Sequence, residues 1–117
     1  MADFAPTQPI FVQIRERIAG MILNETVGEG EALPSVRSIA ADLSVNPLTV
    51  SRAYDALVDL GVVESRRGTG MFVAPGARDK LLAHEREQFL ADEWPRLGAR
   101  IKALGLDLKT LLGETGK

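Results

Sequence analysis

The side chains best suited to bind another molecule lie on one face of a helix expected after Asn46-Pro47. Asn is a favoured N-cap and Pro is favoured at the first helical position, so this dipeptide is typical of a helix start. At about 100° per residue, one side of the helix collects Leu48, Ser51, Arg52 and Asp55. The opposite side collects Val50, Ala53, Tyr54 and Leu57, which predict a buried face. Such a helix can recognise a partner through hydrogen bonds, charge and apolar contact.

The sequence lacks the residue combinations that carry common catalytic chemistry. It contains no cysteine and a single histidine, His84, which excludes thiolate zinc sites, disulfides and a Cys-His pair. No phosphate-binding glycine loop and no nucleophile elbow occurs along the 117 residues. We therefore expect no enzyme activity, no metal site and no cofactor.

Two further helices are expected before the helix that follows Asn46. The first begins at Pro9 and ends in a loop at Gly28 and Gly30, and its apolar residues recur at spacings of three and four: Phe11, Ile14, Ile18 and Met21 or Ile22. A short second helix follows Pro34, with Ser35 as its N-cap and an apolar stripe of Val36, Ile39, Ala40 and Leu43. Ser44-Val45 is expected to form a tight turn, and Gly61 to end the third helix.

A β-hairpin is expected directly after the third helix. Two β-prone runs, residues 62–66 and 71–74, flank the glycine-rich turn Arg67-Gly68-Thr69-Gly70. Pro75-Gly76 ends the hairpin, and it predicts a boundary between a domain of residues 1–75 and a segment of residues 76–117.

The remaining residues predict a short helical tail with an apolar seam. Large apolar residues recur at spacings of four, three, four and three, which is typical of helices that pack on helices: Leu90, Trp94, Leu97, Ile101 and Leu104, with Phe89 beside them. Pro95 interrupts the pattern, so we expect two helices that meet near Asp92, a break at Gly105 and a last helical turn or two before Gly113. The seam is too apolar to face water. It can fold back onto the first domain or pack against a second copy, and the separating Pro75-Gly76 favours the second copy.

Three helices followed by a hairpin define the order of a winged helix-turn-helix, a mostly α fold with a small β-hairpin wing. A helix with a polar outer face fits the major groove of DNA, which is about 12 Å wide. Three stretches carry a closer resemblance: Leu33-Pro34-Ser35-Val36-Arg37, Thr49-Val50-Ser51-Arg52-Ala53-Tyr54 and Arg67-Gly68-Thr69-Gly70. Through them the sequence resembles the GntR family over residues 9–74. The short tail, which ends in Leu106-Asp107-Leu108-Lys109-Thr110-Leu111-Leu112, is similar to the YtrA-type subfamily.

The resemblance implies a bacterial transcription regulator, usually a repressor, that binds a palindromic operator in double-stranded DNA as a homodimer. It implies DNA contacts from the second helix, the third helix and the wing, which carry Ser35, Arg37, Asn46, Leu48, Thr49, Ser51, Arg52, Arg66, Arg67, Gly68, Thr69 and Gly70. Leu48 departs from the polar residue expected in relatives, although it can touch a thymine methyl group. Because one winged helix covers only a half-site, we assign the tail seam to a dimer interface of Phe89, Leu90, Trp94, Leu97, Ile101 and Leu104.

Charge leaves two alternatives open. The formal net charge is -2, and residues 1–76 carry six Lys and Arg against nine Asp and Glu, so the total charge gives DNA binding no support. Arg37 and Arg52 can instead pair with Asp42 or Asp55 at the surface. A winged helix can also bind protein or RNA.

Two further expectations concern ligands and location. A small-molecule effector is an open possibility, and a tail this short would hold it between helices or at the dimer interface. The first nine residues have neither the basic nor the apolar stretch of a signal peptide, and no apolar run approaches the ~20 residues of a membrane span. We therefore expect a soluble, cytoplasmic protein with no membrane partner.

Overall fold

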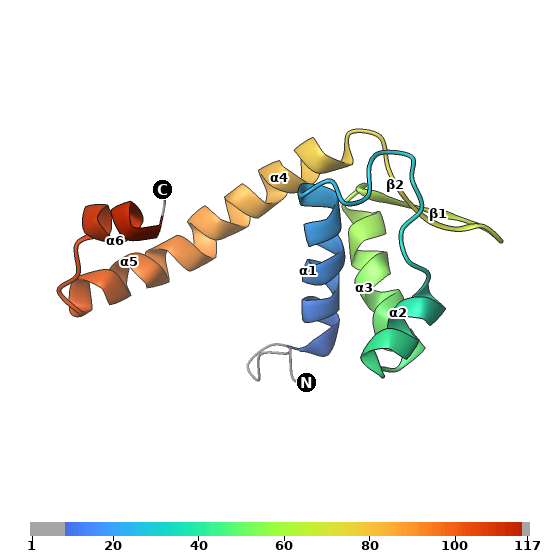
Figure 1. Cartoon of the computed structure of the whole chain (residues 1–117), viewed down its shortest axis with the longest axis horizontal. Coiled ribbons are helices and arrows are strands. Elements are labelled where there is room, and N and C mark those ends of the chain that lie inside the picture. The colour runs from blue at the N-terminus through green and yellow to red at the C-terminus, as the bar shows by residue number, and fades with distance from the viewer. Residues whose placement is uncertain (1–8, 116–117) are drawn as a thin grey trace. The chain divides into compact units, whose positions relative to one another are not determined.

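The computed structural model describes residues 9–115, with side chains for residues 9–113, and divides into two compact units, Met1–Leu82 and Ala83–Lys117 (Figure 1). We name the first the winged-helix unit and the second the tail unit. The first eight residues, where the sequence predicts no signal peptide, lie outside the described range. Within that range no helix is both long and apolar enough to cross a membrane.

Three helices form the body of the winged-helix unit: α1 (Ile10–Leu23), α2 (Val36–Leu43) and α3 (Pro47–Asp59). The predicted N-caps of α2 and α3 are confirmed. Ser35 Oγ accepts a hydrogen bond from Ser38 N at 3.0 Å, and Asn46 Oδ1 accepts one from Leu48 N at 2.8 Å. Each cap satisfies a backbone N–H that has no partner inside its helix, which fixes where α2 and α3 begin.

The end of α3 is also as predicted. Gly61 has a φ of 80°, a left-handed conformation that glycine adopts without a side-chain clash. Its N–H donates to Val58 O at 2.9 Å, and the N–H of Val62 donates to Leu57 O at 3.1 Å. These paired bonds satisfy the last carbonyls of α3 and turn the chain directly into the hairpin.

The end of α1 differs from the prediction, because α1 stops at Leu23, well before Gly28. Asn24 turns the chain there: its Oδ1 accepts hydrogen bonds from Thr26 N at 2.9 Å and from Thr26 Oγ1 at 2.6 Å. Side chains of this type compete with the helix for local backbone groups, and they do so here before the glycines are reached.

The predicted hairpin is confirmed as β1 (Val63–Arg66) paired antiparallel with β2 (Gly70–Val73), in a register that places Val63 opposite Val73. The segment before α2 lies along the other side of β2. Leu33 N donates to Met71 O at 2.8 Å, and Val73 N donates to Glu31 O at 3.0 Å. This third backbone partner ties the hairpin to the body of the unit.

One hydrophobic core joins all of these elements. Its largest fully buried side chains are Tyr54, Ile14, Ile18, Ile22, Leu57 and Leu81. Tyr54 donates its hydroxyl to the carbonyl of Pro34, which ties α3 to the residues that lead into α2. Ala77 and Leu81 belong to α4 (Ala77–Gln88), and their burial extends the compact unit past the predicted boundary at Pro75-Gly76.

The tail unit contains a π-helical turn, η1 (Phe89–Glu93), followed by α5 (Trp94–Ala103) and α6 (Leu108–Thr115). The two helices expected to meet near Asp92 are α4 and α5, and η1 joins them without a break in the helical backbone. The N–H of Trp94 bonds to the carbonyl of Phe89, five residues back, and this wider turn lets the helix pass Pro95, which has no N–H to donate. The break at Gly105 is confirmed. Asp107 Oδ2 caps the start of α6 by accepting from Thr110 N at 3.1 Å, and α6 continues through Gly113, past its predicted end.

Candidate nucleic-acid interface

The outer face of α3 presents the side chains that the sequence grouped together. Leu48 is 70% exposed, Arg52 is exposed, and Thr49 and Ser51 are half-buried. On the inner face Val50 and its neighbours are buried, so the helix cannot rotate without moving apolar groups into water. The core therefore fixes which residues α3 offers to a partner.

Arg52 is held by a contact that its own helix does not supply. Its guanidinium carbon lies 4.8 Å from the centroid of the Phe11 ring, at the start of α1. Among the described residues it forms no ion pair with Asp55, so the alternative in which Arg52 pairs along α3 is not what the structure has. The helical spacing of the sequence gives no signal for this contact, since it depends on how α1 packs against α3.

The start of α2 offers a second basic group. Arg37 is exposed at the second position of α2, and within the described range it has no ion pair with Asp42. Ser35 and Asn46, also predicted to contact DNA, use a side-chain oxygen for capping. Their remaining donors, a hydroxyl and an amide NH₂, stay available.

The wing holds its two arginines differently. Arg66 lies on β1, with its guanidinium 4.0 Å from the Phe72 ring centroid and 3.2 Å from Glu64 Oε1. Arg67 lies in the turn, is exposed, and its side chain has no hydrogen bond or ion pair within the described residues. The wing therefore carries one restrained cation and one free cation.

The wing turn depends on its glycines. Gly68 has a φ of 74° and Gly70 a φ of 129°, and the turn is closed by Thr69 N donating to Arg66 O at 2.9 Å. Both angles strain any residue with a Cβ. The expectation that at least one of these glycines needs a positive φ is confirmed.

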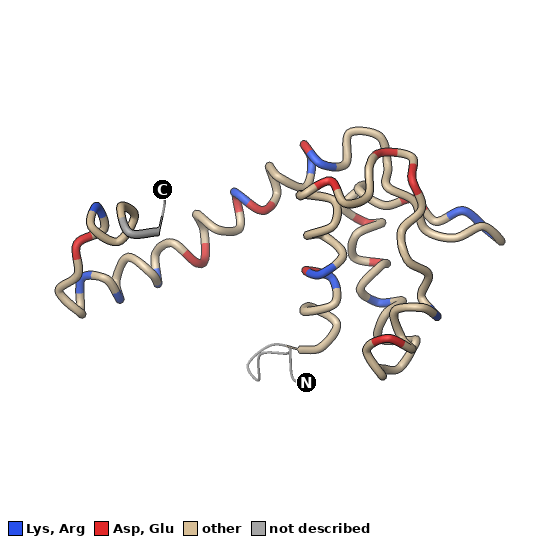
Figure 2. The backbone as a smooth tube through the Cα atoms, viewed as in Figure 1, with Lys and Arg blue, Asp and Glu red and all other residues tan. Residues whose placement is uncertain are grey.

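The arrangement of charge explains how an acidic unit can meet an anion. Every basic residue among residues 1–76 is an arginine, the side chain whose planar fork matches phosphate and guanine. Figure 2 shows basic positions on the hairpin, at the start of α2 and along α3. Of the nine acidic residues in the same range, three lie in the loop before α2, and four share α2, α3 or β1 with the arginines. The support for a nucleic-acid partner is that Arg37, Arg52 and Arg67 are exposed and form no ion pair within the described residues, and not an excess of positive charge on these elements.

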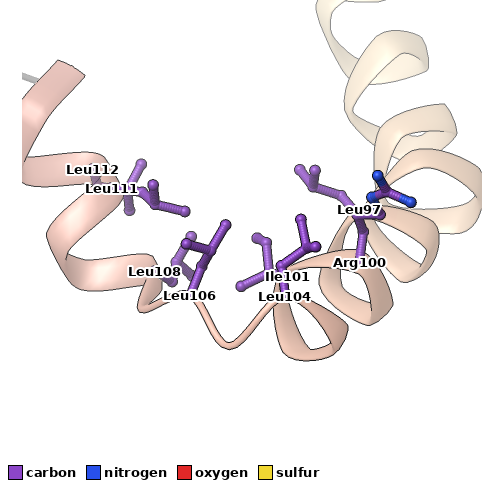
Figure 3. A pocket seen from close by; sticks show the side chains of 8 residues that line it. All are labelled: Leu97, Arg100, Ile101, Leu104, Leu106, Leu108, Leu111 and Leu112. Atoms are coloured by element: carbon purple, nitrogen blue, oxygen red, sulfur yellow. The ribbon is translucent and has the colours of Figure 1, made fainter.

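The tail unit contains an apolar groove instead of a charged face. Figure 3 shows leucines of α6 facing α5 across an opening of about 400 Å³, lined by Leu97, Arg100, Ile101, Leu104, Leu106, Leu108, Leu111 and Leu112. Three of the six residues assigned to a dimer interface meet here, namely Leu97, Ile101 and Leu104. Phe89 and Trp94 form a separate ring pair with centroids 6.3 Å apart. The leucines of α6 were missed, although their density between residues 106 and 112 was the available signal.

These features together define a winged helix-turn-helix, the fold of a large class of DNA-binding regulators. The comparisons with known proteins make the class specific. Residues 11–73 match the family described as bacterial regulatory proteins, gntR family. The chain belongs to the GntR family, whose members are transcriptional regulators with a DNA-binding domain and not enzymes.

Similarity to individual relatives extends over the tail. The chain is 35% identical to the HTH-type transcriptional regulator YhcF of Bacillus subtilis, over 94% of this chain and 89% of that protein. It is 31% identical to the HTH-type transcriptional repressor YtrA of the same organism, over 92% of each chain. The chain is therefore YtrA-like within its family.

Two solved structures are similar in fold. A GntR family transcriptional regulator from Listeria monocytogenes is 27% identical with a TM-score of 0.76, over 97% of each chain. The DNA-binding domain of AraR in complex with operator ORE1 is 26% identical with a TM-score of 0.57, over 63% of this chain and 88% of that chain.

Proposed function

We propose that this regulator is a cytoplasmic repressor that binds a palindromic DNA operator as a homodimer. The observation that carries the proposal is the exposed face of α3, which presents Arg52 and Leu48, flanked by the unpaired cations Arg37 and Arg67. A similar domain in AraR is bound to an operator, and YtrA is named a repressor. Occupying a promoter with such a dimer would block transcription without any further activity.

The side chains divide into those that read bases and those that bind the backbone. Arg52 would donate two hydrogen bonds to the O6 and N7 atoms of a guanine in the major groove. Leu48 would contact a thymine methyl group, while Thr49 and Ser51 supply hydroxyls nearby. Arg37 and Arg67 would bind phosphates, which position the protein without reading sequence.

The dimer is proposed from the exposure of the tail. Eight large apolar side chains of the tail unit are exposed: Phe89, Leu90, Trp94, Leu97, Leu104, Leu106, Leu108 and Leu112. Burying half of them would contribute about 6–12 kcal/mol, which is of the order of the cost of association. A two-fold dimer presents two copies of α3, which accounts for the proposed symmetry of the operator.

Effector sensing is a second candidate function, favoured by the groove between α5 and α6. Its lining is aliphatic apart from Arg100, which suits an apolar ligand of drug-like size. A ligand seated there would compete with dimer packing, because Leu97 and Leu104 belong to both. A ligand that releases DNA should then lower the dimer fraction measured by light scattering, and a ligand that leaves this fraction unchanged would contradict the competition.

The experiment that tests DNA reading is Arg52→Ala. Binding sites are first selected from random duplexes, and the affinity of each single-base variant is then measured for the wild type and for Arg52→Ala. We expect a loss of about 1–3 kcal/mol and a relaxed preference at one position in each half-site. Arg86→Ala, which removes the same charge from an exposed position of α4, is the matched control and should leave the preference intact.

Three outcomes of this experiment contradict the proposal. An equal loss on all sequences would make Arg52 a phosphate contact, and no loss would remove it from the interface. Equal affinity for single-stranded RNA of the selected sequence would favour an RNA-binding winged helix. Specific DNA binding should also weaken steeply with salt, as phosphate contacts require.

A further inference from the structure

Phe11, in the first turn of α1, contacts Arg52 on the proposed DNA-reading face. Its ring lies under the guanidinium of Arg52, with 4.8 Å between the guanidinium carbon and the ring centroid. This distance is within the roughly 6 Å over which an aromatic face attracts a cation. The two residues come from different helices that pack side by side in the winged-helix unit (Figure 1).

The ring is not needed to fill the core. Phe11 is half-buried and lies outside the cluster of buried residues that begins with Ile14 on the same helix. Of its two neighbours in the first turn, Ile10 is exposed and Val12 is half-buried. An aliphatic residue would serve such a position equally well if packing were its only task.

Arg52 has a specific need for such a support. A free arginine samples many rotamers, and ordering its side chain on binding costs conformational entropy. A guanidinium stacked on a ring has already lost part of that freedom. Its N–H groups lie in the guanidinium plane and remain available to donate hydrogen bonds. Asp55, which lies on the same face of α3, does not pair with Arg52 and so does not compete for those N–H groups.

We propose that Phe11 is a positioning residue that determines base specificity through Arg52. This inference rests on the proposed function, in which Arg52 reads a base. The aromatic face of Phe11 holds the guanidinium in one orientation, so that both hydrogen bonds to a guanine form together. A residue in the first turn of α1 thereby contributes to sequence recognition without touching DNA.

The test measures operator affinity for the full-length protein with changes at Phe11, each made in the wild-type and Arg52→Ala backgrounds. Phe11→Leu removes the ring but keeps an apolar side chain. Pentafluorophenylalanine at position 11 keeps the ring shape and reverses its quadrupole, so it leaves the fold undisturbed even where Phe11→Leu does not. Phe11→Trp strengthens the attraction to a cation. Ile10→Ala, on the exposed part of the same turn, is the matched control.

In the wild-type background, Phe11→Leu and the fluorinated ring should each weaken binding about two- to fivefold per half-site, as expected for an exposed cation–π contact. The base preference should weaken only at the position where Arg52→Ala also weakens it, and preferences at the other positions should be unchanged. Phe11→Trp should retain both affinity and preference, and Ile10→Ala should change neither. In the Arg52→Ala background none of the Phe11 changes should have a further effect.

Several results would overturn the inference. A Phe11 effect of equal size in both backgrounds would mean that Phe11 acts independently of Arg52. Tighter binding by the fluorinated protein would mean that the ring withholds Arg52 from DNA. Full activity of the fluorinated protein beside a weakened Phe11→Leu would leave only a packing role. If Arg52→Ala alone has no effect, the proposed base reading fails on that measurement, separately from any change at Phe11, and the positioning role fails with it.

Discussion

All seventeen buried apolar residues of the described chain lie between Ile14 and Leu81, in the winged-helix unit. In the tail unit no described side chain is buried, and eight large apolar residues are exposed. Only two such residues, Ile10 and Leu48, are exposed in the described part of the winged-helix unit. The two units thus have similar apolar sequence patterns, but the first buries its apolar side chains and the second leaves them exposed.

This difference indicates which kind of partner each unit is suited to bind. The winged-helix unit buries its apolar residues within itself, and no buried side-chain polar atom of the described residues lacks a hydrogen bond. The tail unit leaves its apolar surface exposed, which soluble proteins avoid over areas of this kind. The first unit exposes arginines, so we expect it to bind DNA. The second exposes leucines, so we expect it to pack against a second copy of the chain.

The largest expected effect comes from charging the tail groove with the double variant Leu97→Glu and Ile101→Glu. Two carboxylates in the apolar seam should prevent the proposed dimer, since burial of unpaired charge is very unfavourable. Operator affinity should then fall by about 100-fold or more, because the second half-site loses its effective concentration. Light scattering and operator titration measure the two effects on the same sample.

The control for this prediction is Ala103→Glu, at an exposed position of α5 on the side away from Leu97, Ile101 and Trp94. It adds the same kind of charge and should leave both dimer and affinity intact. A double variant that remains dimeric would contradict a dimer interface in the tail unit. A monomeric variant that binds the operator normally would show that operator binding does not depend on the tail unit.

A smaller effect is expected inside the winged-helix unit from Tyr54→Phe. The hydroxyl of Tyr54 donates to the carbonyl of Pro34, so its removal leaves that carbonyl without its partner. We expect the free energy of unfolding to fall by about 1–3 kcal/mol in urea titrations at neutral pH. The oligomeric state should not change, because the residue is fully buried in the winged-helix core.

The same variant gives a pH test with a defined sign. Burial raises the pKa of Tyr54 above its ordinary value of 10.0, because the buried site disfavours the phenolate. Its contribution to stability is therefore complete below about pH 10 and is lost as the pH rises further, since the unfolded chain releases this proton first. Wild type should lose stability more steeply than Tyr54→Phe, by up to about 1.4 kcal/mol per pH unit. Parallel slopes would contradict a raised pKa.

Local signals made the winged-helix unit predictable. Ser35, Asn46 and Gly61 act on backbone groups within a few residues, so their types and spacing predicted where α2 and α3 begin and where α3 ends. The wing followed from two β-prone runs around glycines. The outer face of α3 was predictable because one helical period separates buried from exposed positions.

Features set by packing between elements were not predictable in this way. The stacking of Phe11 on Arg52 depends on the angle at which α1 crosses α3, and the periodicity alone placed Phe11 on the buried face. The π turn at Phe89–Glu93 interrupts the α-helical period between Leu90 and Leu97, and Leu90 does not line the groove formed by Leu97 and Ile101, so heptad spacing alone did not predict which seam residues meet there. The boundary at Pro75-Gly76 was placed from turn residues, which carry no information on the burial of Leu81.

The smallest expected effect is a difference between the two arginines of the wing in how much each contributes to the salt dependence of DNA binding. It also tests whether the charged surface of the winged-helix unit acts separately from the apolar surface of the tail unit. Arg67 is free, so Arg67→Ala should remove a phosphate contact. The slope of log affinity against log salt should become shallower by about 0.9 per protomer. The affinity for all DNA sequences should fall about fivefold per contact near 0.15 M salt. Arg66 is already engaged by Glu64 at 3.2 Å and by the Phe72 ring, so Arg66→Ala, the matched control, should lower the slope less. Neither variant should change the dimer, because neither residue belongs to the tail unit. An Arg66→Ala slope that falls as far as that of Arg67→Ala would show that the ring and carboxylate release Arg66 to DNA, and a changed dimer fraction in either variant would show that the winged-helix unit contributes to association after all.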